Sequence, residues 1–470
     1  MRRSKRATAV LAGALLLGAC SARTSSLPQA VPMSTEGAVR STSAAATPGG
    51  LPAAGGSLTV VPPSSVESSA VTSSTQKSAD PQVTSSSQST PSTPSTVPAT
   101  PGSPTSAKPK PKPKSATVAA SPEFGTEQAN PARALTVKAA GGTISALTVY
   151  AADGSTLKGS FSADRTQWSS DQRLRYGGSY HAKGTATGPA GSDPTTIDGV
   201  WTTVDGSTQT TSISPGNGAK VGVAVPIIIR FGTCGADHSA VEPHVSITTT
   251  PKVELRGAWI RHDSDDCRSL DVRPEKFWPE GTKVHVAVDL LGVQVADGVW
   301  GSKDIATSDF TIGRNQVTYA DGRTHMITVK QDGKVVASYP TSMGRGDDVG
   351  DPRMVTRSGI HVVIGKEADK KMTNEKFGYK DLPEPWSVRI SNNGEFIHQN
   401  MGTVDVQGKQ NVSHGCLNLS DVNAKAYFNS SIYGDPVVIT GTSVPLSASD
   451  GDLYDWAVPW DQWRTLGART

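Results

Sequence analysis

Cysteine, aromatic side chains and long apolar runs are all scarce in this sequence. Only 4 of the 470 residues are cysteine, so the role of each one can be considered individually. The 45 basic and 42 acidic residues leave a formal net charge of +3, without the strong basic bias expected of a nucleic-acid-binding chain. The apolar run at residues 7–17 is too short to cross a bilayer as a permanent helix. The sequence therefore gives no support for a nucleic-acid partner or for a membrane-spanning helix in that run.

The N-terminus has the features of an export signal. Basic residues at positions 2, 3, 5 and 6 precede the apolar run, as in signal peptides. The run ends in Leu-Gly-Ala-Cys at residues 17–20, which resembles a bacterial lipobox. Lipidation of Cys20 would then anchor the protein to the outer face of the cell membrane, whereas the alternative is an ordinary secretory cleavage site. In both cases the mature chain works outside the cytoplasm, where disulfides can form.

Residues 21–131 are rich in Ser, Thr, Pro and Ala and contain almost no aromatic residue. Such a segment cannot bury enough apolar surface to offset its chain entropy, and we expect it to be disordered. It is predicted to be a tether that lets the following domains extend away from their anchor.

The most informative stretch is residues 413–418, which read Ser-His-Gly-Cys-Leu-Asn. It contains Cys416, and the fourteen residues 399–412 separate it from His398. A thiol is a good nucleophile only as the thiolate, and a neighbouring histidine can take or supply the proton. Gly415 lets the backbone turn tightly, and we expect it to leave amide N–H groups free to face an oxyanion. These features indicate cysteine-based acyl transfer.

Two other interpretations of Cys416 are open on the residues alone. A free cysteine often packs as a small apolar core residue. Cys416 could also join His398 and His414 as a zinc ligand, although zinc sites want three or four ligands and no further cysteine lies nearby.

The longer pattern around Cys416 resembles a known family signature. A histidine, a gap of fourteen residues and then Ser-His-Gly-Cys-hydrophobic-Asn is similar to the L,D-transpeptidase (YkuD-like) catalytic domain. The resemblance implies a mostly-β catalytic domain at residues 315–441. Alternation at 326–338 predicts a hairpin there, and Ser420 is the expected N-cap of a helix at 421–428. The Trp-rich extension at residues 442–470 is similar to that of mycobacterial relatives, and we expect it to pack on the domains because bare tryptophans would be an apolar hazard.

Two further modules precede the catalytic one. Short alternating runs separated by turn signals predict antiparallel β-sandwiches at residues 132–211 and 212–314. The second also resembles a bacterial immunoglobulin-like domain of actinobacterial L,D-transpeptidases, notably at residues 277–282. The expected fold is thus mostly β: two immunoglobulin-like β-sandwiches, then the catalytic domain with a short helix and a docked C-terminal tail.

Cys234 and Cys267 both lie in the second module. Cys20 is the expected lipidation site and Cys416 the expected nucleophile, so the other two form the natural disulfide pair in an oxidising compartment. His238, His244 and His262 lie in the same module, but their spacing supports a metal site poorly. We expect no metal and no organic cofactor.

The resemblance implies roles residue by residue. Cys416 would be the nucleophile, His398 the proton donor and acceptor, and the main-chain carbonyl of Gln399 the group that orients the imidazole. The supporting residues beside the nucleophile would be Ser413, His414 and Gly415. The residues lining the acyl-donor site would be Tyr379, Asn393, Gly394 and Asn418.

The chain departs from the family pattern at three places. Gln399 stands where relatives often have Ser, and the turn Thr-Arg-Ser-Gly at residues 356–359 lacks a proline that the family commonly has. The flap at residues 366–379 is highly charged where relatives are more apolar. Such a run is either a solvated loop or an unusual lid that changes substrate or inhibitor preference.

The predicted function is that of a lipid-anchored peptidoglycan L,D-transpeptidase. The resemblance implies a tetrapeptide stem as acyl donor, the side-chain amine of a diamino acid in a second stem as acceptor, and a 3→3 cross-link as product. It also implies carbapenems as covalent inhibitors. The alternatives are an L,D-carboxypeptidase, an enzyme that attaches proteins to peptidoglycan, and a non-catalytic wall-binding lipoprotein.

Overall fold

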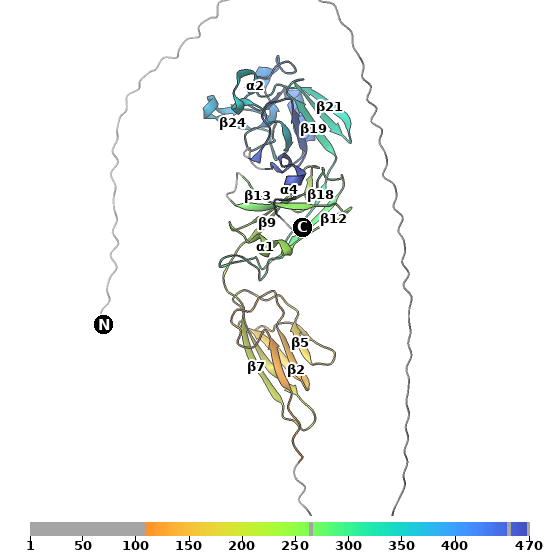
Figure 1. Ribbon diagram of the computed structural model, residues 1–470, viewed down its shortest axis with the longest axis vertical. Coiled ribbons are helices and arrows are strands. Elements are labelled where there is room, and N and C mark those ends of the chain that lie inside the picture. Colours follow the sequence, from red (N-terminus) through yellow and green to blue (C-terminus); the bar gives the residue numbers. More distant parts are fainter. Residues whose placement is uncertain (1–109, 263–266, 449–452, 468–470) are drawn as a thin grey trace, which may run out of the picture. The chain divides into compact units, whose positions relative to one another are not determined.

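The computed structural model describes residues 110–262, 267–448 and 453–467 (Figure 1). Strands dominate these ranges, and the longest described helix is α3 (Asp421–Ser430), with ten residues. The protein is therefore mostly β, as predicted. None of the helices in these ranges combines the length and apolar character that a membrane span requires. The predicted signal peptide at 1–20, including Cys20, and the first part of the predicted tether lie outside the described residues.

The first module is formed by two antiparallel sheets. One has the strand order β1 (Thr117–Ser121), β2 (Thr136–Ala140), β5 (Gln167–Ser170) and β4 (Gly159–Phe161). The other has the order β3 (Thr143–Ala151), β6 (Ser179–Thr187) and β7 (Thr195–Thr202). Alternate residues of β2 point inward, so Val137 is fully buried while Lys138 is exposed. Trp201 is fully buried in the same core.

Part of the predicted tether belongs to this module. Strand β1 pairs along its whole length with β2, and Ala116 just before it is buried. Phe124 packs on Trp201 with ring centroids 4.8 Å apart, and the Trp201 indole donates to Pro122 O at 2.7 Å. The predicted tether boundary at residue 131 is therefore wrong. The strand has only small side chains, and its stability comes from pairing with β2 rather than from its own composition.

The second module is also built from two main sheets. One has the order β10 (Lys220–Val221), β18 (Ala306–Ile312), β15 (Lys283–Val288) and β12 (Val245–Thr250). The other has the order β13 (Arg256–Arg261), β14 (Arg268–Arg273), β11 (Ile227–Phe231) and β9 (Thr211–Ser214). Smaller elements complete it: α1 (His238–Val241), η1 (Glu242–His244), β8 (Ser207–Thr208), β16 (Gln294–Ala296) and β17 (Val299–Trp300). Its core lies between the sheets and includes Trp259 and Trp278.

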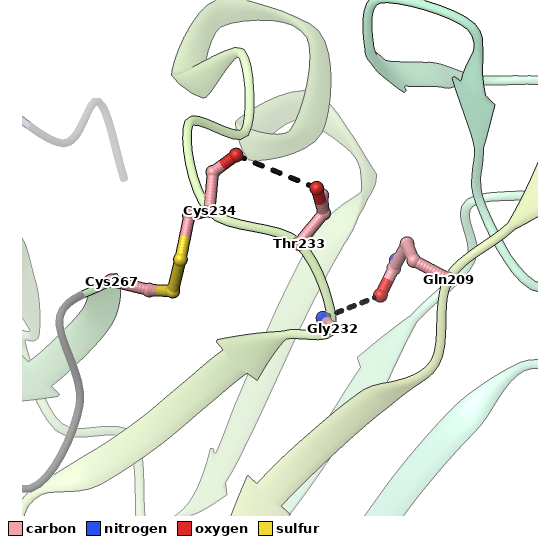
Figure 2. Close-up of a disulfide and its surroundings, with 5 residues drawn as sticks. All are labelled: Gln209, Gly232, Thr233, Cys234 and Cys267. Atoms are coloured by element: carbon pink, nitrogen blue, oxygen red, sulfur yellow. Dashed lines mark hydrogen bonds between the residues drawn. A yellow bond between two sulfur atoms is a disulfide. The ribbon is translucent and has the colours of Figure 1, made fainter.

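A disulfide joins Cys234 and Cys267, which are 33 residues apart in the chain (Figure 2). It links the loop after β11 to the residue immediately before β14. The same loop is held to the preceding part of the chain, because Gly232 N–H donates to Gln209 Oε1 at 2.8 Å.

The third module carries the predicted catalytic residues. Its larger sheet has the order β21 (Lys334–Pro340), β20 (Met326–Gln331), β19 (Gln316–Asp321), β29 (Pro436–Thr440) and β22 (Gly359–Val362). A second sheet has the order β23 (Gly365–Glu367), β26 (Ser387–Arg389), β27 (Phe396–Gln399) and β28 (Leu417–Leu419). A separate hairpin consists of β24 (Lys371–Asn374) and β25 (Tyr379–Pro383). The short helical turns are α2 (Gly346–Val349), η2 (Pro352–Met354), η3 (Glu375–Phe377) and η4 (Met401–Thr403).

The hairpin and helix predicted for this module are present. Strands β20 and β21 are antiparallel neighbours, and α3 begins after Ser420, whose hydroxyl accepts from Asn423 N–H at 3.4 Å. The helix buries Ala424 and Tyr427 against the core.

The C-terminal tail packs on the second module. It contains η6 (Asp455–Ala457) and α4 (Trp460–Trp463). Trp463 is fully buried against Ala258 and Ile260 of β13. The guanidinium of Arg273 lies 4.4 Å from the ring centroid of Trp463 and also faces the rings of Trp456 and Trp460. Burial lowers the pKa of Arg273 to about 10. Trp463 is therefore buried, and Trp456 and Trp460 are partly buried, around one arginine, which reduces the apolar hazard that the sequence implied.

Candidate active site

Two parallel strands bring the predicted nucleophile beside the predicted acid–base residue. In the pairing of β27 with β28, His398 lies opposite Asn418. Cys416 ends the loop that enters β28, so it reaches the same edge of the sheet as His398. His398 is 3% exposed whereas Cys416 is partly exposed and opens into a cavity of about 460 Å³. Every residue predicted for catalysis or substrate binding lines this cavity except Gln399, which contributes only its main chain to the site.

The imidazole of His398 donates from Nδ1 to a main-chain carbonyl and lies beside a carboxylate. Gln399 O lies 2.7 Å from Nδ1, and the carboxylate of Glu384 lies 2.9 Å from the same nitrogen. Nε2 is then the ring nitrogen left for an interaction with the Cys416 side chain. Burial alone would lower the pKa of His398, but the interactions with Cys416 and Glu384 outweigh it and raise that pKa to about 10.

The loop before Cys416 is fixed by hydrogen bonds to its own main chain. Ser413 Oγ donates to Cys416 O at 2.6 Å and accepts from Gly415 N–H at 3.1 Å. Gly415 has φ +133°, a conformation that favours glycine. The buried hydroxyl of Thr356 donates to Gly415 O at 2.8 Å. The Ser413 hydroxyl thus occupies the Gly415 N–H, so this amide is not one of those expected to be free to face an oxyanion.

A second loop forms the opposite wall beside the thiol. Cys416 Sγ lies 3.5 Å from Gly394 O, and Gly394 adopts a positive φ of 96°. The next residue, Glu395, is buried and accepts from Ser391 Oγ and from Arg357 N–H. These contacts tie the loop to the turn at residues 356–359, the turn that lacks the family proline.

The charged flap is a wall of the cavity rather than a detached solvated loop. Its rings pack on His414: Phe377 stacks at 4.7 Å between centroids and Tyr379 at 5.9 Å. Lys370 and Lys371 of the flap also line the cavity. Burial raises the pKa of Tyr379, and the nearby Cys416 and Glu384 raise it further. The pKa of His414 is lowered by burial and then by the charge of Arg345.

Sequence reasoning missed two residues that shape the site. Thr356 was recognised only as part of a turn, although its hydroxyl carries the Gly415 contact. Glu384 gave no sequence signal, since a single carboxylate before Pro385 belongs to no motif. As for metals, no group of three His, Cys, Asp or Glu side chains is placed to hold an ion in the ranges 110–262, 267–448 and 453–467.

Comparison with known proteins places the chain in a family. A model of the L,D-transpeptidase catalytic domain matches residues 316–439, and a model of a bacterial Ig domain matches residues 126–294. L,D-transpeptidase 5 of Mycobacterium tuberculosis (strain ATCC 25618 / H37Rv) is 41% identical over 316 residues, which cover 67% of this chain and 69% of that relative. The chain belongs to the L,D-transpeptidase family.

Other L,D-transpeptidases are similar over much of the chain. L,D-transpeptidase 2 of Mycobacterium tuberculosis (strain CDC 1551 / Oshkosh) is 35% identical over 344 residues, which cover 71% of this chain and 81% of that relative. A solved L,D-transpeptidase in complex with imipenem is 31% identical, with a TM-score of 0.40, and covers 48% of this chain and 97% of its own. The region matched by the Ig-domain model extends across the boundary drawn between the two predicted N-terminal modules.

Proposed function

We propose that this member of the family is a peptidoglycan L,D-transpeptidase that forms 3→3 cross-links through a thioester on Cys416. The observation that carries the proposal is the pairing of Cys416 with His398 at one edge of the cavity. The imidazole is held at Nδ1, so its other nitrogen is available for the thiol. Family membership supports the reaction class, and the geometry supports Cys416 as the nucleophile and His398 as the acid–base group.

Acylation requires the proton of Cys416 Sγ to be on His398. The sulfur attacks the carbonyl carbon of the third residue, a diamino acid, of a tetrapeptide stem. A C–S bond forms and the C–N bond to the terminal D-alanine breaks. The imidazolium gives its proton to the departing amine, which leaves a thioester and a neutral His398.

The second half-reaction transfers the acyl group to another stem. Neutral His398 accepts a proton from the side-chain amine of the incoming diamino acid as that nitrogen attacks the thioester. The C–N bond of the cross-link forms, the C–S bond breaks, and Cys416 leaves as the thiolate while the proton stays on His398. Tyr379, Asn393, Gly394 and Asn418 line the cavity in which the donor stem would lie.

Purified disaccharide-tetrapeptide tests the proposal directly. Wild-type protein should release D-alanine and produce a cross-linked dimer, and Cys416→Ala should produce neither, as measured by mass spectrometry. A free tripeptide in place of the dimer would identify a carboxypeptidase. No product from the wild-type protein would contradict the proposed activity.

We also propose that carbapenems acylate Cys416. The strained β-lactam carbonyl would take the place of the stem carbonyl, and the thiol is accessible from the cavity. The relative in complex with imipenem belongs to the same family. Intact-protein mass spectrometry should show one added drug in the wild type and none in Cys416→Ala.

A lipid anchor on Cys20 at the outer face of the cell membrane is the localisation we propose. Its support is the basic residues, apolar run and Leu-Gly-Ala-Cys sequence at residues 2–20. Cells labelled with an alkyne-bearing fatty acid should yield labelled wild-type protein in the membrane fraction. Cys20→Ser should lose the label, and a label that persists in this variant would rule out the anchor.

A further inference from the structure

Glu384 lies where the flap returns to the body of the third module. It follows β25, and its main chain is held on both sides: its N–H donates to Lys370 O at 2.8 Å, and its carbonyl accepts from Ser387 Oγ at 2.7 Å. The residue is 6% exposed. Its carboxylate is thus held inside the protein rather than free to move on a loop.

Pro385 and Trp386, the two residues after Glu384, connect this turn to β27 and α3 by hydrogen bonds. Gln399 N–H donates to Pro385 O at 3.0 Å, so the chain at Glu384 runs beside β27 next to His398. Trp386 then ties the turn to α3, since its indole donates to Asp421 Oδ1 at 3.0 Å. This framework puts the Glu384 carboxylate 2.9 Å from His398 Nδ1.

We propose that Glu384 is a positioning residue that completes a Cys416–His398–Glu384 array and holds the resting enzyme as a thiolate–imidazolium pair. The inference rests on the proposed role of Cys416 as nucleophile. The proton moves from Cys416 Sγ to His398 Nε2, while Nδ1 keeps its own proton, which it donates to Gln399 O beside the Glu384 carboxylate. No other reactant is needed, because the transfer only separates charge within the array.

The Glu384 carboxylate supplies a negative charge, which the main-chain carbonyl of Gln399 cannot. Gln399 O orients the ring but carries no net charge, so it does little to offset a buried imidazolium. A buried charge is costly unless an opposite charge and a hydrogen bond accompany it. Glu384 supplies the opposite charge 2.9 Å from Nδ1, and Gln399 O accepts the hydrogen bond from Nδ1–H.

The other charged groups of the cavity do not replace Glu384. The cations that line the cavity are Arg353, Arg357, Lys370, Lys371 and Arg389. Their positive charges would destabilise an imidazolium on His398. The remaining titratable side chains are Tyr379, His414 and Glu395. Glu395 is engaged by Ser391 and the Arg357 main chain, and Lys370 pairs with Glu367 at 2.8 Å. The raised pKa of His398 agrees with this arrangement, since Glu384 is one of its two sources.

The test is the pH dependence of thiol alkylation, which requires no stem peptide. Full-length wild type and Glu384→Gln are treated with iodoacetamide across a range of pH, and mass spectrometry of the peptide containing Cys416 gives the rate. Glu384→Gln should move the midpoint of the rate profile upward by at least about one pH unit. Below the wild-type midpoint its rate should fall about tenfold, because one pKa unit is a factor of ten.

Two variants sharpen the result. Glu384→Asp keeps a carboxylate farther from the ring, so it should shift the midpoint in the same direction by less, and it serves if the glutamine variant fails to fold. Glu367→Gln makes the same charge change on an exposed flap carboxylate outside the cavity and should leave the midpoint in place. An unchanged midpoint in Glu384→Gln, or an equal shift in Glu367→Gln, overturns the proposal. If alkylation behaves as expected but no dimer forms from stem peptides, the proposed function fails while the array stands.

Discussion

The ring of Phe377 stacks on the ring of His414, with centroids 4.7 Å apart and planes inclined by 16°. This contact closes one side of the cavity with a residue from the charged flap. The flap therefore borders the cavity with the rings of Phe377 and Tyr379 as well as with charged side chains.

Removing the Phe377 ring should loosen the flap. An aromatic pair contributes roughly 0.5–1.5 kcal/mol, so Phe377→Ala should slow carbapenem acylation of Cys416 by about two- to tenfold. The measurement is the rate of adduct formation by intact-protein mass spectrometry. Val335→Ala serves as control because Val335 is exposed on β21, outside the cavity. Equal rates in wild type and Phe377→Ala would show that the stacking does not hold the flap.

The side chain of Gln399 should matter little. Only its carbonyl oxygen contacts the imidazole, and every residue has that oxygen. Gln399→Ala should therefore retain acylation within about twofold, whereas His398→Ala should slow it by about 10²–10⁴-fold, the usual contribution of an acid–base group. Both rates come from the loss of carbapenem absorbance. A large defect in Gln399→Ala would mean that the side chain has a role beyond the contact described.

Acylation should fail at high pH. The pKa of His398 is raised to about 10, so the imidazolium that protonates the leaving nitrogen is present at lower pH and is lost as the pH rises through about 10. The carbapenem acylation rate, corrected with a Cys416→Ala blank, should fall across that range. A decline centred near pH 6.5, the ordinary value for histidine, would contradict the assignment.

Gly415→Ala should destabilise the site through the backbone. The added methyl would meet only Glu395 Cγ at 3.8 Å, which is ordinary contact, but φ +133° is strained for alanine. We expect a loss of about 1–3 kcal/mol in the free energy of unfolding and slower acylation of the displaced Cys416. Denaturant unfolding measures the change in the free energy of unfolding. Gly365→Ala is the matched control, with open space at Cβ and no positive φ, and it should change stability little.

The disulfide should stabilise the second module without taking part in catalysis. On the chain-entropy model, a loop closed over 33 residues contributes about 4 kcal/mol. The double variant Cys234→Ser/Cys267→Ser should lower the urea midpoint and leave the carbapenem adduct on Cys416 unchanged. Loss of the adduct in a protein that remains folded would contradict this prediction, because the disulfide of the second module would then affect the reactivity of Cys416 in the third.

The sequence alone was sufficient where the information is local or chemical. Residues 413–418 predict Cys416 as the nucleophile because a reactive cysteine needs specific neighbours close along the chain. Strand β15 alternates cleanly between polar and apolar residues, and Ser420 caps α3, so both could be predicted from period and capping. The burial of the C-terminal tryptophans also follows from their apolar area, although their partner Arg273 does not.

Only the tertiary structure decided the features that depend on long-range pairing. Strand β1 forms because β2 supplies its hydrogen bonds, while its own small residues resemble those of the tether. The amide of Gly415 is occupied because the loop folds back on the Ser413 hydroxyl. Glu384 lies beside His398 because Pro385 O accepts a hydrogen bond from Gln399 N–H. No sequence motif relates these two segments. Hydrogen bonds between separate segments set such positions, and a linear sequence carries no period or motif that records them.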